Sequence, residues 1–172
     1  MLARTKMALD DLHSPNGRRA ETAVYLIAVF GRATTQTLQT IRTYRRDRFD
    51  EWWAPKAAFM KSDPLLIFFN RVRNAFLKEG GMTHSGGWLI GVGGAISRRR
   101  YKWDWFITGA PTEHDGKPIP AASPDGPTIE TLGQLYVTFL DRLVRDTAEE
   151  FKWRAIPPPW RLPGPKRLLP GE

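Results

Sequence analysis

The sequence predicts a mainly α-helical protein: an antiparallel bundle of four or five helices with a small β-hairpin insertion before the last helix. Three observations support this fold class. Apolar residues recur at spacings of three and four over most of residues 18 to 78 and again from 128 to 153. Hydrophobic residues make up 41% of the 172 residues, which is enough for a packed core. Short connections between successive helical segments favour antiparallel neighbours.

The first two predicted helices occupy residues 1 to 12 and 18 to 46, with the turn formers Ser14-Pro15-Asn16-Gly17 between them. The centre of the second, residues 24 to 30, is apolar on all sides and would also fit a buried strand. Its length and the helical period of its apolar stripe favour a helix. The stripe consists of Ala23, Ile27, Phe30, Thr34, Leu38, Ile41 and Tyr44.

Two further helices are predicted at residues 48 to 60 and 64 to 78. The first of these contains Pro55, which fits either its first turns or a kink. Asp63 is a suitable N-cap for the second, because its carboxylate accepts hydrogen bonds from unpaired backbone N–H groups. Pro64 suits the first helical position, since it lacks an N–H that would have no partner there.

The pattern changes after residue 80, where glycine becomes frequent. Residues 101 to 108 alternate with period two, which predicts a strand paired with one around residues 88 to 96. Together they form a β insertion at about residues 86 to 110. Residues 109 to 127 contain five prolines and His114-Asp115-Gly116-Lys117, a tight turn within a long loop.

The last helix is predicted from residue 128 to about residue 153. Its apolar stripe consists of Leu132, Tyr136, Phe139, Leu140, Leu143, Ala148 and Phe151. From residue 156 to 172 six prolines preclude a packed core. The chain therefore divides into a helical domain with the β insertion, residues 1 to 155, and a proline-rich basic tail, residues 156 to 172.

Charge and composition restrict the compartment and the chemistry. The net charge is +8, but residues 152 to 172 hold five basic residues and one acidic, so half of the excess belongs to the tail region. With no cysteine, disulfides and thiolate catalysis are excluded, and a cytoplasmic location fits. The longest apolar run, residues 23 to 30, is too short to cross a bilayer. We therefore expect a soluble protein with no membrane contact.

Arg73 is the most informative residue, because it falls within the apolar arc of the helix at residues 64 to 78. A desolvated guanidinium is costly unless it is paired and hydrogen-bonded. One interpretation is that Arg73 reaches the edge of the bundle or pairs with a structural carboxylate. The other is that Arg73 and Asn74 line a cleft shared with another helix or subunit, where their donors meet phosphate.

Two further segments have compositions that can bind phosphate or nucleic acid. The glycines at residues 91 to 94 do not precede a helix, so tight strand packing explains them better than a phosphate loop. The basic run at Arg98, Arg99, Arg100 and Lys102 is interleaved with aromatic residues and is a candidate nucleic-acid-binding segment. A solvated basic turn followed by aromatic residues that face the bundle is the explanation we favour. The three histidines, His13, His84 and His114, lack metal-ligand spacing, so neither a metal nor a cofactor is expected.

The order of long helix, aromatic-rich helix, Asp-Pro, apolar run, Arg-Asn, small loop and later long helix resembles the HEPN superfamily over roughly two-thirds of the chain. Members are all-helical bundles that often act as metal-independent ribonucleases. Their motif is an arginine, usually followed by a polar residue, and then a histidine some four to six residues further on. Arg73 and Asn74 match its first half, whereas position 78 is Lys78 and the next histidine, His84, lies eleven residues after Arg73.

The missing histidine matters, because metal-free RNA cleavage needs a group that exchanges a proton near neutral pH. Either the site binds without cutting, or His84 folds back, or Lys78 is desolvated enough to serve. The resemblance implies a homodimer in which Arg73 and Asn74 of two subunits face a common cleft and bind RNA or a nucleotide. Alternatively, the protein is a non-enzymatic helical adaptor whose hairpin and basic tail contact a protein partner, or Arg73 merely pairs within the bundle.

Overall fold

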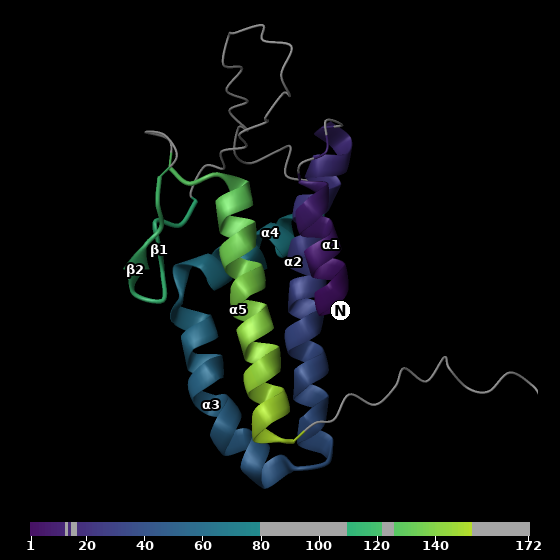
Figure 1. Cartoon of the computed structure of the whole chain (residues 1–172), viewed down its shortest axis with the longest axis vertical. Helices are drawn as coiled ribbons and strands as arrows, with labels where there is room; N and C mark the ends of the chain where they lie inside the picture. The colour runs from purple at the N-terminus through teal and green to yellow at the C-terminus, as the bar shows by residue number, and fades with distance from the viewer. Residues whose placement is uncertain (13, 15–16, 80–109, 122–125, 153–172) are drawn as a thin grey trace, which may run out of the picture.

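The computed structural model describes residues 1–12, 14, 17–79, 110–121 and 126–152. Within them the protein is mainly helical, with five α-helices and a small two-stranded antiparallel hairpin before the last helix, which confirms the predicted fold class (Figure 1). The helices are α1 (Leu2–Asp11), α2 (Gly17–Gln39), a short 3-10 helix η1 (Thr40–Thr43), α3 (Arg46–Ser62), α4 (Pro64–Glu79) and α5 (Ile129–Glu150); the strands are β1 (Glu113–His114) and β2 (Lys117–Pro118).

Most of the predicted β insertion at residues 86 to 110 lies outside the described residues, as does the tail at residues 156 to 172. The described hairpin is instead formed by the segment predicted as a tight turn, residues 114 to 117. None of the described helices combines the length and the apolar character that a membrane crossing requires.

Helix α5 lies between α2 and α3, with α1 beside α2, and α4 crosses behind their upper halves (Figure 1). Helices α3 and α5 are antiparallel: Arg48 near the start of α3 forms an ion pair of 2.7 Å with Glu150 at the end of α5. Further along, the rings of Phe59 and Phe139 lie 5.9 Å apart. Large side chains therefore fill the space between these two helices.

The core is built from the apolar stripes that the helical period predicts, and their burial is the main favourable term in folding. Its largest fully buried apolar side chains are Val24 and Ile27 of α2, Phe49 of α3, Leu65 and Phe69 of α4, and Leu132 and Leu140 of α5. Helix α5 begins at the predicted place, because the hydroxyl of Thr128 accepts a hydrogen bond from the N–H of Thr131 at 3.1 Å.

The second helix is shorter than predicted. It ends at Gln39 and tightens into η1 instead of continuing to residue 46. Residues 39 to 45 are all exposed except Ile41, so little packing against the core supports further turns of α2. The periodicity had placed Tyr44 on the apolar stripe, but this residue is 83% exposed. Pro55 lies inside α3 and beyond its first turns, so the predicted placement in the first turns is wrong.

Gly31 allows α2 and α5 to approach closely. A Cβ atom at this position would lie 2.4 Å from Cε1 of Tyr136 and 2.6 Å from its hydroxyl oxygen. The Tyr136 ring stacks on Phe69 with ring centres 4.2 Å apart and planes 9° apart, so it has little freedom to move away. Space beside the tyrosine, not backbone conformation, therefore requires glycine here.

We expect Gly31→Ala to lower the free energy of unfolding by about 1–3 kcal/mol, because overpacking outweighs the higher helix propensity of alanine. The matched control is Gly133→Ala in α5. There the nearest atom to a new Cβ is Cδ1 of Leu9 at 3.0 Å, the end of a flexible side chain. Urea unfolding followed by circular dichroism measures both. Equal stabilities for the two variants would contradict the close approach at Tyr136.

Candidate functional site

The carboxylate of Asp63 joins helix α4 to the hairpin. Its Oδ1 accepts a hydrogen bond from the N–H of Leu66 at 3.1 Å, which confirms the predicted N-cap. Nδ1 of His114 lies 3.0 Å from both carboxylate oxygens, and the N–H of Asp115 donates to Oδ2 at 2.9 Å. Asp63 is 4% exposed, so this small network is shielded from water.

The hairpin supplies these donors through a two-residue turn. His114 pairs with Lys117, and between them Asp115 and Gly116 have φ of 52° and 67°. Left-handed backbone at both central residues is typical of the turns that connect hairpin strands directly. The tight turn predicted at residues 114 to 117 is thus confirmed, but the sequence did not predict that His114 would bind Asp63.

Arg73 and Asn74 are both half-buried on α4 and contact each other. Nε and Nη2 of Arg73 donate to Oδ1 of Asn74 at 3.2 Å and 2.5 Å. Among the described residues, no carboxylate forms an ion pair with Arg73. The interpretation in which an internal carboxylate neutralises this arginine therefore has no support in that part of the chain.

The other residues predicted for the site cannot be placed beside this pair. Lys78 belongs to α4, but its side chain is not among those described. His84 and the basic run at Arg98, Arg99, Arg100 and Lys102 lie outside the described residues. Their roles in catalysis and in nucleic-acid binding stay predictions.

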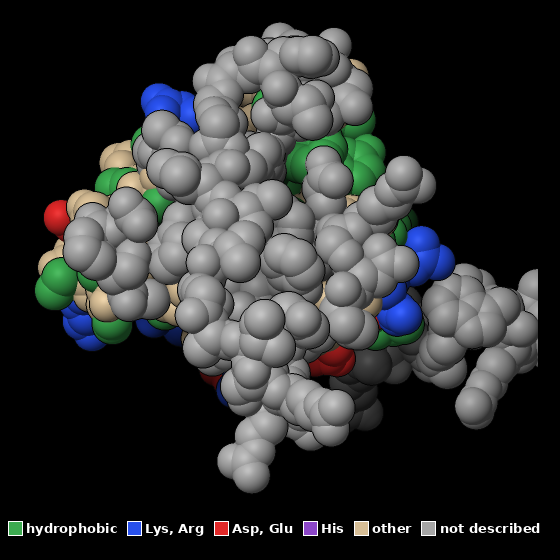
Figure 2. All heavy atoms as spheres, turned by 90° about the horizontal axis from the view of Figure 1, so that it is seen from above, with side chains coloured by type: hydrophobic (Ala, Val, Ile, Leu, Met, Phe, Trp, Pro, Cys, Tyr) green, Lys and Arg blue, Asp and Glu red, His purple; other side chains and the backbone are tan. Residues whose placement is uncertain are grey.

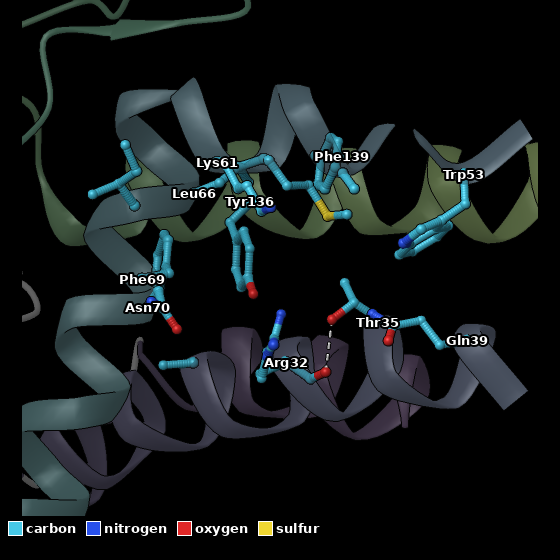
Figure 3. Close-up of a pocket in the computed structure, with 14 residues that line it drawn as sticks. Arg32, Thr35, Gln39, Trp53, Lys61, Leu66, Phe69, Asn70, Tyr136 and Phe139 are labelled. Atoms are coloured by element: carbon cyan, nitrogen blue, oxygen red, sulfur yellow. Dashed lines mark hydrogen bonds between the residues drawn. The ribbon is translucent and has the colours of Figure 1, made fainter. Parts of the chain in front are cut away.

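Tyr136 is a buried phenol close to two arginines. It is 7% exposed, and its hydroxyl points toward Arg32 (Figure 3). Burial raises the pKa of this hydroxyl well above its ordinary value of 10.0, and the nearby charges of Arg32 and Arg73 lower the pKa by a smaller amount. The phenol is therefore a neutral hydrogen-bond donor at physiological pH, within electrostatic range of both guanidinium groups.

A pocket of about 490 Å³ opens beside Tyr136, and side chains from α2, α3, α4 and α5 line it (Figure 3). We name it the interhelical pocket. Its polar lining residues are Arg32, Thr35 and Gln39 of α2, Lys61 of α3, Asn70 of α4 and Tyr136 of α5; its aromatic lining residues besides Tyr136 are Trp53, Phe69 and Phe139. No Asp or Glu is among the lining residues, so the pocket carries positive charge.

The charged side chains on the surface in Figure 2 form no single basic patch among the residues that are coloured. In the view of Figure 2, the Lys and Arg side chains that are coloured lie at separate places around the face and not in one continuous patch. No group of three or more His, Asp or Glu side chains within the described ranges is arranged to hold a metal ion. Binding of an anion by a few arginine and lysine side chains is the chemistry that the described residues support best.

Sequence reasoning missed the pocket, because its residues come from four helices and share no motif. One signal was present: Gly31 interrupts the apolar centre of a long helix, and a glycine inside a helix often marks a close approach. That signal predicts a bulky neighbour but does not identify Tyr136.

No protein-family model, curated protein or solved structure matches this chain. The likeness to HEPN proteins therefore depends on the Arg73-Asn74 motif and the order of helices alone.

We expect Asp63→Ala to lower the free energy of unfolding by about 2–4 kcal/mol, because the helix loses its cap and buried donors lose their acceptor. His114→Ala keeps the cap, so its loss should be smaller. Ser62→Ala is the matched control, since this exposed hydroxyl bonds only to carbonyl groups of its own helix. Urea unfolding compares the three. A loss for Asp63→Ala no larger than that for Ser62→Ala would rule out the junction as a stabilising contact.

Alkaline pH should destabilise the folded protein through Tyr136. Its pKa is raised in the folded state relative to the unfolded chain, so its contribution is complete below about pH 10 and is lost as pH rises above that value. In that range we expect the wild type to lose up to about 1.4 kcal/mol more per pH unit than Tyr136→Phe. Urea unfolding between pH 9 and pH 11.5 measures both. Parallel curves for the two proteins would show that ionising Tyr136 costs nothing.

Proposed function

We propose that the protein binds RNA or a nucleotide through phosphate groups that contact Arg32 and Arg73. One observation carries the proposal: both guanidinium groups lie within electrostatic range of the Tyr136 hydroxyl, and neither forms an ion pair with a carboxylate of the described residues. Arginines without an acidic partner are suited to phosphate, because the planar guanidinium matches phosphate oxygens and stays charged at all physiological pH values.

Asn74 supports this role by orienting Arg73. Its Oδ1 accepts from two N–H groups of the guanidinium, which leaves the remaining N–H groups available for an anion. An amide also adds no negative charge that would compete with phosphate for the arginine. In this proposal Arg73 binds the phosphate, and Asn74 is a positioning residue.

Cleavage of bound RNA needs more than these residues supply. Arg73 is a poor base, and the raised pKa of Tyr136 leaves almost no phenolate to accept a proton near neutral pH. Metal-independent cleavage would therefore depend on Lys78 or His84. Lys78 stands where the HEPN motif would have its histidine, and His84 is the next histidine along the chain. In this proposal the protein is a cytoplasmic homodimer, in which the Arg73 side chains of the two subunits face one RNA.

We expect Arg73→Ala and Arg32→Ala each to weaken binding of a fluorescent single-stranded RNA about tenfold or more, because each variant removes a charge-assisted contact. Arg71→Ala is the matched control: it removes the same charge from an exposed position on the same helix. Fluorescence anisotropy at one fixed salt concentration measures the affinities. Equal losses for Arg71→Ala and Arg73→Ala would contradict a specific site and leave only general attraction of a basic protein.

The same samples decide between binding and cleavage. Incubation of RNA with the wild type in the presence of a chelator should leave the RNA intact if the site only binds. If the RNA is degraded, Arg73→Ala should abolish the degradation and Arg71→Ala should retain it. Degradation that persists in Arg73→Ala would assign the activity to another site and contradict a catalytic role for Arg73.

A further inference from the structure

The interhelical pocket has the size of a small-molecule site. Its volume of about 490 Å³ lies within the range of about 300–1,000 Å³ that is usual for ligand pockets. It lies where α2, α3, α4 and α5 meet, so elements far apart in the sequence form its walls (Figure 3). Side chains on packed helices hold such a shape better than side chains on loops.

The apolar walls of the interhelical pocket suit an aromatic ligand. Trp53 of α3 and Phe139 of α5 line the pocket on one side of Tyr136, whereas Phe69 stacks on the other side of the Tyr136 ring (Figure 3). The remaining apolar lining is aliphatic or thioether. Aromatic rings prefer offset or edge contacts with other aromatic rings, at roughly 0.5–1.5 kcal/mol beyond simple burial in general. A flat aromatic ligand therefore gains more here than an alkyl chain of equal area.

The polar groups suit an anion. Arg32 and Lys61 both line the pocket, and both are exposed, so they remain hydrated and charged while the pocket is empty. The carboxamides of Gln39 and Asn70 also lie along the wall and add donors without adding charge. With two cations and no acidic side chain in the lining, a neutral or cationic ligand would leave the charge of the pocket uncompensated.

The buried hydroxyl of Tyr136 lines the pocket and has no hydrogen-bond acceptor among the described residues. In contrast, the hydroxyl of Thr35 donates to the carbonyl of Arg32 at 2.8 Å. Buried hydroxyl groups are nearly always hydrogen-bonded, and leaving one without a partner costs stability. A ligand that brings an acceptor to Tyr136 would satisfy it.

We propose that the interhelical pocket binds a small aromatic anion, whose ring lies against Trp53 and Phe139. Its anionic group is neutralised by Arg32 and Lys61 and accepts a hydrogen bond from Tyr136. The shared chemistry is an aromatic ring that bears a carboxylate or a phosphate. This inference rests on the proposed function, because both use Arg32, and it deepens that function by adding an aromatic ring and a defined pocket to the anion. Arg73 is not one of the lining residues, so the two can be tested apart.

The experiment uses two pairs of probes on the full chain, measured by isothermal titration calorimetry. Indole-3-acetate is compared with tryptophol, which has the same ring and no charge, and adenosine monophosphate is compared with ribose 5-phosphate, which has the phosphate and no ring. We expect at least one aromatic anion to bind about tenfold more tightly than its partner. The pair that shows the difference identifies carboxylate or phosphate. No difference in either pair would overturn the proposal.

Substitutions in and outside the pocket then test whether the probe binds there. Lys61→Ala and Tyr136→Phe should each weaken the bound probe about tenfold, because each removes one polar contact to an anion. The matched control is Lys56→Ala on the same helix, whose ammonium group lies 3.8 Å from the centre of the Trp52 ring and outside the pocket. Equal effects at Lys56 and Lys61 would overturn the assignment of the site.

A pocket-filling variant adds a test that does not depend on charge. Ala57 lines the pocket from α3, so Ala57→Phe should abolish probe binding while the thermal midpoint stays close to that of the wild type. If this variant fails to fold, the comparison of Lys61→Ala with Lys56→Ala still decides. Loss of RNA binding in Arg73→Ala together with no aromatic-anion binding would uphold the proposed function and overturn the pocket inference alone.

Discussion

The arrangement of the upper part of the molecule depends on one buried carboxylate. Asp63 ends the connection from α3, caps the first turn of α4 and accepts hydrogen bonds from the hairpin at His114 and Asp115. A buried carboxylate needs several donors to compensate for lost hydration, and three groups from two separate segments provide them here. The start of α4 and the hairpin are therefore fixed to the same point.

The position of α4 has consequences for the rest of the site. With Asp63 as the N-cap of α4, Phe69 stacks on Tyr136, and Arg73 lies one helical turn after Phe69. On the opposite side Gly31 lets the tip of the tyrosine reach the backbone of α2. The phenol is thus held between α2 and α4, where burial raises its pKa and the charges of Arg32 and Arg73 lower the pKa by a smaller amount.

Several features could be predicted from the sequence because they are local. The N-cap at Asp63 and the turn at residues 114 to 117 follow from the preferences of single residues, and both are present. Arg73 stood out because a charge on an apolar stripe is unusual. Its effect on the Tyr136 hydroxyl could not be predicted, since Tyr136 lies on a helix that is far away in the chain. The end of α2 was also misplaced, because periodicity continues into Tyr44 where no core is present to bury it.

By itself the sequence determined the fold class: helical periods, caps and turn formers are short-range properties, and they specify which segments are helices. It also identified Arg73 as a residue that needs a polar partner. The tertiary structure alone decided that Asp63 binds the hairpin and that a positively charged, aromatic pocket lies between α2, α3, α4 and α5. The physical reason is that apolar stripes specify burial but not partners, so which helix faces which is settled only when all of them pack together.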